Sequence, residues 1–580
     1  MEDTERLSRI LEVDTPYQTD VDSTEDIQGG RDNPGDPIDP PTGLSKVRHA
    51  ILVASMFLAL FLPALDQTIV STALPNIMYS LRAESSNSGY TWIGSAYALA
   101  QAVVMPFFGQ ASEVFGRKWA FLTAISIFMV GSCLCGASQN VSMLIASRTV
   151  QGMGAGGITG LVIILIGDLV STRKRGKYQG FIGATFAVAS ALGPVLSGVL
   201  AQHVSWRWVG DAKPPMFDPL LINLLFLNIS RPTKSFRDSI QSLDFLGIVS
   251  VSLTTVMLLL AFEWASLGES WGSTRIVSCL LVSSFAFVSF IFAETRAIKP
   301  VIPLRFFTHP TRIGAYISAF FHAIGYMGLN YYLPIYFQAV RGESASQSGI
   351  SMLPIVLMFG IVSTGAGYLI TVTKRYQELI WASFVLATVG CGLLIMLNES
   401  TPTAVVVILL LVAGIGVAPC FNSLLIPIHA SFDDTFDNSA IAMSASAYSF
   451  IRTIGLSLGI SISGLVCFDG LRQLDAGKTS GLSISQLIEK LNTMDRADKS
   501  RTVGVFSSAM RNVFIQVTVM MAIGMLASFL IQRHMLGEKI RSDHKIAMVT
   551  RDQRKNDQKD RVTVEAVKAT LNSNLVRSSK

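Results

Sequence analysis

Long apolar blocks separated by short polar connections make up most of this chain. The blocks are about 20 residues long, the length that an α-helix needs to cross a hydrocarbon core of roughly 30 Å. Most of them lack the polar face that a helix on the surface of a soluble domain shows. The pattern therefore predicts an all-α polytopic membrane protein with about fourteen spans, at residues 50–75, 90–110, 119–137, 141–170, 178–201, 216–229, 245–263, 275–293, 313–337, 349–370, 378–397, 403–427, 441–467 and 513–532.

Basic residues concentrate in every second connection between these blocks. Arg117 and Lys118 follow the second block, and a run from Arg173 to Lys177 follows the fourth. Further Lys and Arg residues follow the sixth, eighth and tenth blocks. Because such residues collect on the cytoplasmic side of a membrane, we expect an even number of spans and both chain ends in the cytoplasm.

The two ends of the chain differ from the apolar part. Residues 1–48 are acidic and contain no apolar run, which predicts a disordered cytoplasmic tail rather than a signal peptide. Residues 533–580 are polar and mostly basic, and they are expected to form a second cytoplasmic tail.

Composition narrows the class of protein. Hydrophobic residues make up 50% of the 580 and charged residues only 15%, whereas soluble domains contain about 25% charged residues. The net charge of +6 bears on orientation in the membrane and indicates no nucleic acid partner. The six cysteines lie in or beside apolar blocks without metal-ligand spacing, so we expect small buried apolar residues. We expect no metal, no cofactor and no enzymatic activity.

Two ionisable residues lie inside apolar blocks. Asp66 is in LDQTIVSTALP, residues 65–75, and Arg148 is in RTVQGMGAGG, residues 148–157. Such charges are costly in a membrane and need water or a partner, so we expect Asp66 and Arg148 to pair, with Gln151 as a further hydrogen-bonding group. The pair could take part in proton coupling or could be purely structural.

Two further motifs contain glycine at potential turns or close contacts. GQASEVFGRK, residues 109–118, forms the expected cytoplasmic turn after the second block. Gly109 and Gly116 permit a tight turn, and Glu113 could pair with Arg117 or with a neighbouring helix end. ASALGPVLSG, residues 189–198, interrupts the fifth block at its central Gly-Pro pair. From the residues alone, the first is a solvated turn and the second a packing face.

Other polar residues in or near the blocks carry weaker signals. His322 in the ninth block could bind a proton, but a satisfied structural histidine is the more common case. Arg452 in the thirteenth block could serve packing or line a cavity. Glu263 and Arg341 lie at block ends, and we expect them to be interfacial.

Taken together in their order, the four motifs resemble the major facilitator superfamily, and in particular the fungal efflux-pump branch of its fourteen-span drug:proton antiporter family. SWRW at 205–208, YYLPIYFQAVRG at 331–342 and FIRTIGLSLG at 450–459 are similar to further stretches of that branch. The resemblance implies a major facilitator fold of two six-helix bundles plus two extra central helices. The corresponding boundaries are 49–243 for the first bundle, 244–295 for the extra helices and 296–532 for the second bundle.

The same resemblance implies roles for individual residues. The turn with Gly109, Glu113, Gly116, Arg117 and Lys118 would gate opening, and Arg148 would take part in proton coupling. Gly193, Pro194 and Gly198 would form the motif that is associated with antiporters. The sequence departs from the family at Glu113, where Asp is usual, and at Ala189 and Ser197, where Gly is usual.

The expected function is export of a small organic compound, such as a drug, toxin or secondary metabolite, by proton antiport. The expected partners are the substrate, protons and the lipid bilayer of the plasma membrane, with the protein acting as a monomer. The alternative is transport of basic amino acids or iron–siderophore chelates, in the vacuolar or the plasma membrane.

The sixth block is unusual. Charged residues and prolines interrupt residues 209–232, and the clean apolar run at 220–229 would span only about 15 Å as a helix. We therefore expect a short or distorted sixth span.

Both termini should be cytoplasmic, because the basic connections fall on alternate sides. Reporter domains fused to the N-terminal tail and after residue 540 should both report a cytoplasmic location in protease-protection assays on sealed vesicles. Termini on opposite sides would require an odd number of spans and contradict the fourteen-span topology.

Overall fold

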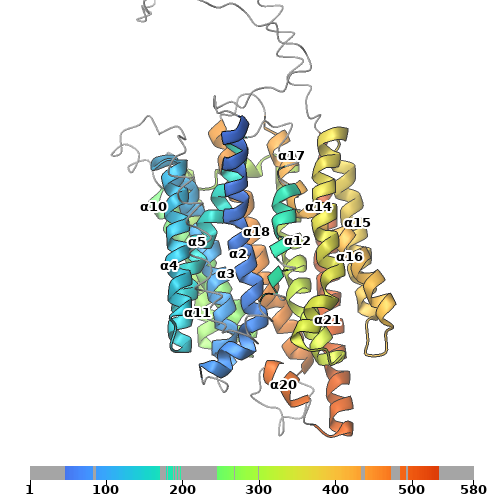
Figure 1. Ribbon diagram of the computed structural model, residues 1–580. Coiled ribbons are helices and arrows are strands. Elements are labelled where there is room, and N and C mark those ends of the chain that lie inside the picture. The colour runs from blue at the N-terminus through green and yellow to red at the C-terminus, as the bar shows by residue number, and fades with distance from the viewer. Residues whose placement is uncertain are drawn as a thin grey trace, which may run out of the picture. The chain divides into compact units, whose positions relative to one another are not determined.

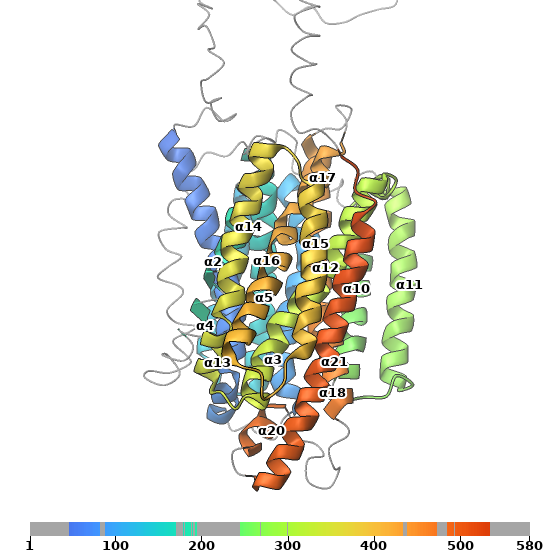
Figure 2. The ribbon, with the colours of Figure 1, turned by 90° about the vertical axis from the view of Figure 1, so that its right-hand side faces the viewer.

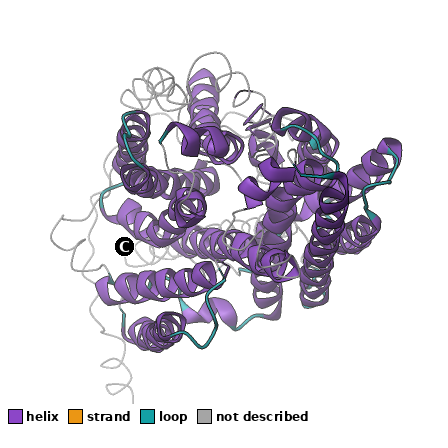
Figure 3. Cartoon of the chain, turned by 90° about the horizontal axis from the view of Figure 1, so that it is seen from below, coloured by secondary structure: helices purple, strands orange, loops and turns teal. Residues whose placement is uncertain are grey.

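The computed structural model describes residues 46–81, 87–169, 244–266, 268–297, 300–432, 438–471, 484–491 and 494–533, with part of 178–196. Within these residues the regular elements are helices (Figures 1 and 3). The expected tails at 1–45 and 534–580, and the unusual sixth block, lie outside the described residues. The fifth block is described in part.

In the described part of the chain, twelve long helices coincide with twelve of the expected blocks. The first four are α2 (Lys46–Ser80), α3 (Asn87–Val114), α4 (Arg117–Gly136) and α5 (Val141–Leu169). They are followed by α10 (Phe245–Ser266), α11 (Thr274–Arg296), α12 (Pro310–Ile335), α14 (Leu353–Thr373), α15 (Gln377–Leu393), α16 (Thr403–Ser423), α18 (Asn438–Leu471) and α21 (Arg496–Ser528). Shorter elements are the 3₁₀ helices at Leu304–Phe307 and Leu394–Met396, the π-helical turn at Tyr336–Val340, and α13 (Ala345–Ser351), α17 (Leu425–Ala430) and α20 (Ile484–Leu491). Eleven helical stretches are long and apolar enough to cross a membrane, within the described part of the chain.

The long helices pack side by side in two groups. The first group consists of α2, α3, α4 and α5. Helix α5 lies against α3 and α4, with α2 beside them. In the second group, α12 packs against α18 and α21, while α15 packs against α16 and α21. The beginning of α2 and the end of α21 lie at the same end of the bundle (Figures 1 and 2), as an even number of spans requires.

Helices α10 and α11 form a hairpin beside the two groups (Figure 2). Helix α10 packs against both α3 and α18, so it contacts each group. In the most apolar stretch of α10, and likewise of α11, only 33% of the residues are buried, compared with 78% for α5. Phe285 and Leu281 of α11 are among its most exposed apolar side chains. In a membrane this exposed face would contact lipid.

The contact between α3 and α18 joins the two groups, and we call it the α3–α18 seam. Three pairs of residues define it: Ala98 with Ser457, Met105 with Thr453, and Gly109 with Ser446. The Ser457 hydroxyl donates to the Ala98 carbonyl at 3.5 Å. At the other end, a Cβ atom at Gly109 would lie only 2.5 Å from Ser446 Oγ. The two helices therefore pack closely along much of their length.

Small residues allow other helices to approach one another at backbone distance. A Cβ atom at Gly416 of α16 would overlap the backbone of Ala387 in α15. Ser383 also donates its hydroxyl to the Gly416 carbonyl at 2.6 Å.

The cysteines are free thiols. Five of the six are buried, whereas Cys133 is exposed, contrary to its expected burial.

Gly416→Ala should lower the thermal stability of the protein, because the new methyl group meets backbone atoms that cannot rotate away. Overpacking of this kind costs about 1–3 kcal/mol. Gly365→Ala in α14 is the matched control, since its new methyl group would have no atom within 4 Å other than those of its own helix and neighbours. Unfolding temperatures of the two variants in detergent should diverge; equal values would show that α15 and α16 separate easily.

Candidate functional site

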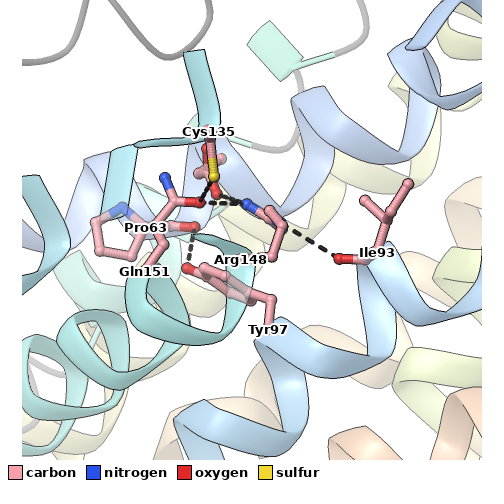
Figure 4. Close-up of polar contacts among 7 residues, drawn as sticks. Pro63, Ile93, Tyr97, Cys135, Arg148 and Gln151 are labelled. Carbon is pink, nitrogen blue, oxygen red and sulfur yellow. Dashed lines mark hydrogen bonds and ion pairs between the residues drawn. The ribbon is translucent and has the colours of Figure 1, made fainter. Parts of the chain in front are cut away.

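A buried ion pair joins α2 to α5. Asp66 and Arg148 are 1% and 3% exposed, and Arg148 Nη1 donates to Asp66 Oδ2. The same nitrogen also donates to Gln151 Oε1 at 2.6 Å (Figure 4). The structure thus brings together the three residues that the sequence singles out as a polar group inside apolar spans.

Helix α3 provides two further contacts to the Arg148 side chain. Its Nε donates to the Ile93 carbonyl at 3.3 Å, and its guanidinium carbon lies 4.2 Å from the centre of the Tyr97 ring (Figure 4). The Tyr97 hydroxyl in turn donates to the Pro63 carbonyl in α2 at 3.2 Å. Tyr97 was missed at the sequence level, because an aromatic residue in an apolar span carries no signal of its own.

The glycines after Arg148 explain how α5 can place this charge so close to α3 and α4. Cβ atoms at Gly152 and Gly156 would collide with the carbonyls of Tyr97 and Gln101 in α3. Gly154 meets the backbone of α4 in the same way. Small residues at these positions let the helix backbones touch, which is how helices associate without a hydrophobic driving force in lipid.

Chemically, this site can link a proton to helix packing. A carboxylate and a guanidinium that share a dry interface attract strongly, and removing either charge leaves the other without its partner. Protonation of Asp66 would neutralise its charge and weaken the attachment of α2 to α5. No metal-binding group of three or more His, Cys, Asp or Glu residues occurs in the described part of the chain.

The turn between α3 and α4 adopts a conformation that favours glycine. Gly116 has φ 89° and ψ 146° and directly precedes α4. Arg117 donates from Nη1 to Ser112 Oγ, and Ser112 donates to the Gly109 carbonyl at 2.7 Å. The end of α3 is thereby tied to the start of α4, at the point where the α3–α18 seam ends.

The remaining motif residues are placed only in part. Glu113 lies in the last turn of α3 and Lys118 in the first turn of α4. Gly193 is buried in a helical segment, whereas Pro194 and Gly198 lie outside the described residues.

His322 and Arg452 meet around one aromatic ring. His322 is 2% exposed, and its Nε2 lies 2.9 Å from the Val417 carbonyl. Its ring contacts Phe421, and the Arg452 guanidinium carbon lies 3.4 Å from the centre of that same ring. His322 therefore has the surroundings of a satisfied structural residue, while Arg452 reaches a cavity.

A cavity of about 40 Å³ lies between the two helix groups. Its polar lining comes from both groups: Gln67, Gln101, Thr159, Ser449, Arg452, Thr453 and Ser457. Sites for organic ligands measure about 300–1,000 Å³, so the groups must move apart before such a compound can enter. Sequence reasoning missed Gln101 and Thr159, since single polar residues in these blocks form no motif. It also missed Gln67, although this residue directly follows Asp66.

Glu263 is enclosed by protein although it lies near the end of α10. It is 3% exposed and buried beside α18, because α10 packs against both α3 and α18 at this level. Arg341 is half-buried and donates to the Thr401 carbonyl at 2.7 Å.

These features define the class of the protein. Many apolar helices in two groups, a polar cavity between the groups and buried charges beside it are the architecture of a multi-pass membrane transporter. The model of the Major Facilitator Superfamily matches residues 56–460, and the chain belongs to that family. The expected all-α major facilitator fold is therefore confirmed.

Fungal relatives agree with this assignment. The efflux pump FUS6 of Gibberella fujikuroi is 35% identical over 457 residues, which cover 78% of this chain and 81% of that protein. The efflux pump dotC of Dothistroma septosporum is 32% identical over 497 residues, which cover 83% of this chain and 84% of that protein.

Solved structures share the fold at low sequence identity. A bacterial homologue of the human lysosomal transporter Spinster, in an inward-facing and unoccupied conformation, aligns with a TM-score of 0.53. It is 15% identical and the alignment covers 84% of this chain and 98% of that one.

The ion pair should show strong energetic coupling in a double-mutant cycle. Asp66→Leu leaves the Arg148 guanidinium buried without its partner, which costs about 3–5 kcal/mol. Arg148→Met strands the carboxylate in the same way. The double variant should lose much less stability than the sum of the single variants, because an apolar pair of similar size replaces both charges. Thermal unfolding of the four proteins measures this coupling, and additive losses would mean that the two charges do not stabilise each other.

Proposed function

We propose that this protein exports a small organic compound in exchange for protons. The observation that carries the proposal is the buried Asp66–Arg148 pair, which joins two helices of the first group close to the central cavity. Relatives named as efflux pumps support export as the direction. The plasma membrane is the proposed location.

In this mechanism the proton and the substrate favour different conformations. A proton on Asp66 weakens the bond to Arg148 and frees α2, and its release restores the ion pair. Any ligand that binds one conformation better shifts the equilibrium toward it, so protonation and cavity access become linked. Gln151 shares the same Arg148 nitrogen and would keep the guanidinium hydrogen-bonded while Asp66 is neutral.

The turn between α3 and α4 is proposed as the gate at one end of the α3–α18 seam. Gly116 adopts a positive φ, and Gly109 lies in close contact with Ser446 of α18. Larger residues would disturb both features. Glu113, Arg117 and Lys118 supply charges at this end. Gly193, Pro194 and Gly198 are proposed to bend the fifth span during exchange.

The cavity bears on the alternative substrates. Among its described lining residues, Arg452 is the charged one, and it is positive. A basic amino acid would therefore meet a like charge there, which disfavours lysine or arginine as the cargo. Iron–siderophore chelates remain a competing substrate class for the test below.

The test begins with a screen in yeast cells that lack their own efflux pumps, with and without this protein. The compounds include fungal toxins, hydrophobic dyes, lysine, arginine and an iron–siderophore chelate. A compound whose cellular accumulation falls is then offered to inside-out plasma-membrane vesicles. Vesicles with an acidic interior should accumulate it, and collapse of the pH gradient by nigericin should abolish accumulation.

Asp66→Asn should reduce this accumulation to the level of vesicles without the protein, at equal protein abundance. The amide oxygen still accepts from Arg148, so folding is preserved while the titration is lost. Asp469→Asn on exposed α18 surface is the matched control and should transport normally. Accumulation driven by an alkaline interior would show symport, and lowered accumulation of only the chelate would establish the alternative cargo.

A further inference from the structure

Glu263 is a buried carboxyl group outside the Asp66–Arg148 pair. It lies in α10, is 3% exposed, and accepts a hydrogen bond on Oε2 from the Ser461 hydroxyl of α18 at 3.2 Å. Its other oxygen, Oε1, accepts no hydrogen bond from the described residues. No ion pair in the described part of the chain involves Glu263, although a charge in this setting is costly without a partner.

A small cavity opens at this carboxyl group. It measures about 20 Å³, and one water molecule needs about 10–15 Å³. The lining is partly polar and comes from three helices: Trp92 and Ser95 of α3, Leu259 of α10, and Ser457 and Ser461 of α18. The site thus has room for a water molecule beside the carboxyl group.

The groups around Glu263 supply no cation. On α12, Tyr332 lies near the carboxyl group and donates its hydroxyl to the Ile460 carbonyl at 3.4 Å. Cys467 of α18 lies beside Tyr332, and Cys279 of α11 packs in the cluster beside Ala265 of α10. The lining residues of α3 carry no ionisable side chain. The proton is therefore the ligand that these surroundings favour, since metal cations require more oxygen ligands than one carboxylate and a few hydroxyls.

The position of Glu263 connects it to the movement of the two groups. Ser461 follows Ser457 by one helical turn, and Ser95 precedes Ala98, so the carboxyl group occupies the next level of the α3–α18 seam. Gly109 lies at the opposite end of that seam. A change of charge at Glu263 would act directly on the contact between α3, α10 and α18.

We propose that Glu263 is a second proton-binding site, which controls whether the α3–α18 seam is closed or open at the end where α10 meets α11. When protonated, the carboxyl group is neutral and packs in the dry seam with Ser461. When deprotonated, it draws water into the adjoining cavity and separates α3 from α18. Its role in transport rests on the proposed proton antiport, whereas proton binding itself does not.

Infrared spectroscopy of the purified full-length protein in nanodiscs tests proton binding without any substrate. A pH titration should show the carbonyl stretch of a buried protonated carboxyl group that disappears in Glu263→Gln. Glu269→Gln, in the α10–α11 connection and paired with exposed Arg275, is the matched control and should keep the band. Ser461→Ala keeps the carboxyl group and removes its hydrogen-bond donor, so the band should remain but shift in frequency.

A distance measurement tests the effect on the seam. Spin labels at Gln139→Cys and Glu399→Cys lie in exposed connections of the first and second groups, in a Cys133→Ser background because Cys133 is the exposed native thiol. The distance between the labels should change over the pH range in which the carbonyl band titrates. Glu263→Gln should hold the low-pH distance at every pH, whereas Glu269→Gln should behave like the parent protein.

Each of three results would overturn the proposal. These are a band that survives in Glu263→Gln, a band unchanged in Ser461→Ala, or a distance that titrates normally in Glu263→Gln. A shift caused by sodium at constant pH would assign the site to a metal cation instead. Failure of the vesicle assay for antiport would leave these spectra unchanged, so the two proposals can fail separately.

Discussion

A guanidinium group held away from water in the middle of an apolar bundle is the constraint around which the first helix group is built. Arg148 cannot lose its charge easily, so its Nε and Nη1 donors need acceptors within the protein. Asp66 from α2, Ile93 from α3 and Gln151 from α5 meet that requirement. Three helices are thereby fixed around one side chain, and the glycine-rich face of α5 follows from the need to bring their backbones together.

The α3–α18 seam has a different character. Ser449, Thr453 and Ser457 each donate their hydroxyl to a carbonyl one turn back in α18. The contacts that Thr453 and Ser457 also make to Met105 and Ala98 of α3 are longer, at 3.7 and 3.5 Å. Separating α3 from α18 would break few interactions of consequence across the seam. The first helix group is held together by a buried ion pair, whereas the α3–α18 seam beside it can open at low cost in free energy. This difference is useful in a transporter, because the group can move as a unit.

Much of the fold could be predicted because crossing a membrane imposes a length and an apolar composition on every span. Twelve helices among the described residues follow the apolar blocks, and the pairing of Asp66 with Arg148 follows from the cost of two isolated charges. Tyr97 and the cavity residues could not be found in this way, since their role depends on which helix faces become neighbours. The enclosure of Glu263 could not be predicted for the same reason, because it results from packing against α18.

Because one face of α11 is exposed, contacts with lipid help to fix the orientation of the α10–α11 hairpin. Because protein contacts cover only a third of this helix, its tilt depends on how well its apolar length of 23 residues matches the local hydrocarbon thickness. A thicker or thinner membrane would tilt α11 and, through their shared contacts, α10 as well. Membrane composition would then shift the balance between the closed and the open α3–α18 seam. The same chain would therefore work differently in membranes of different thickness.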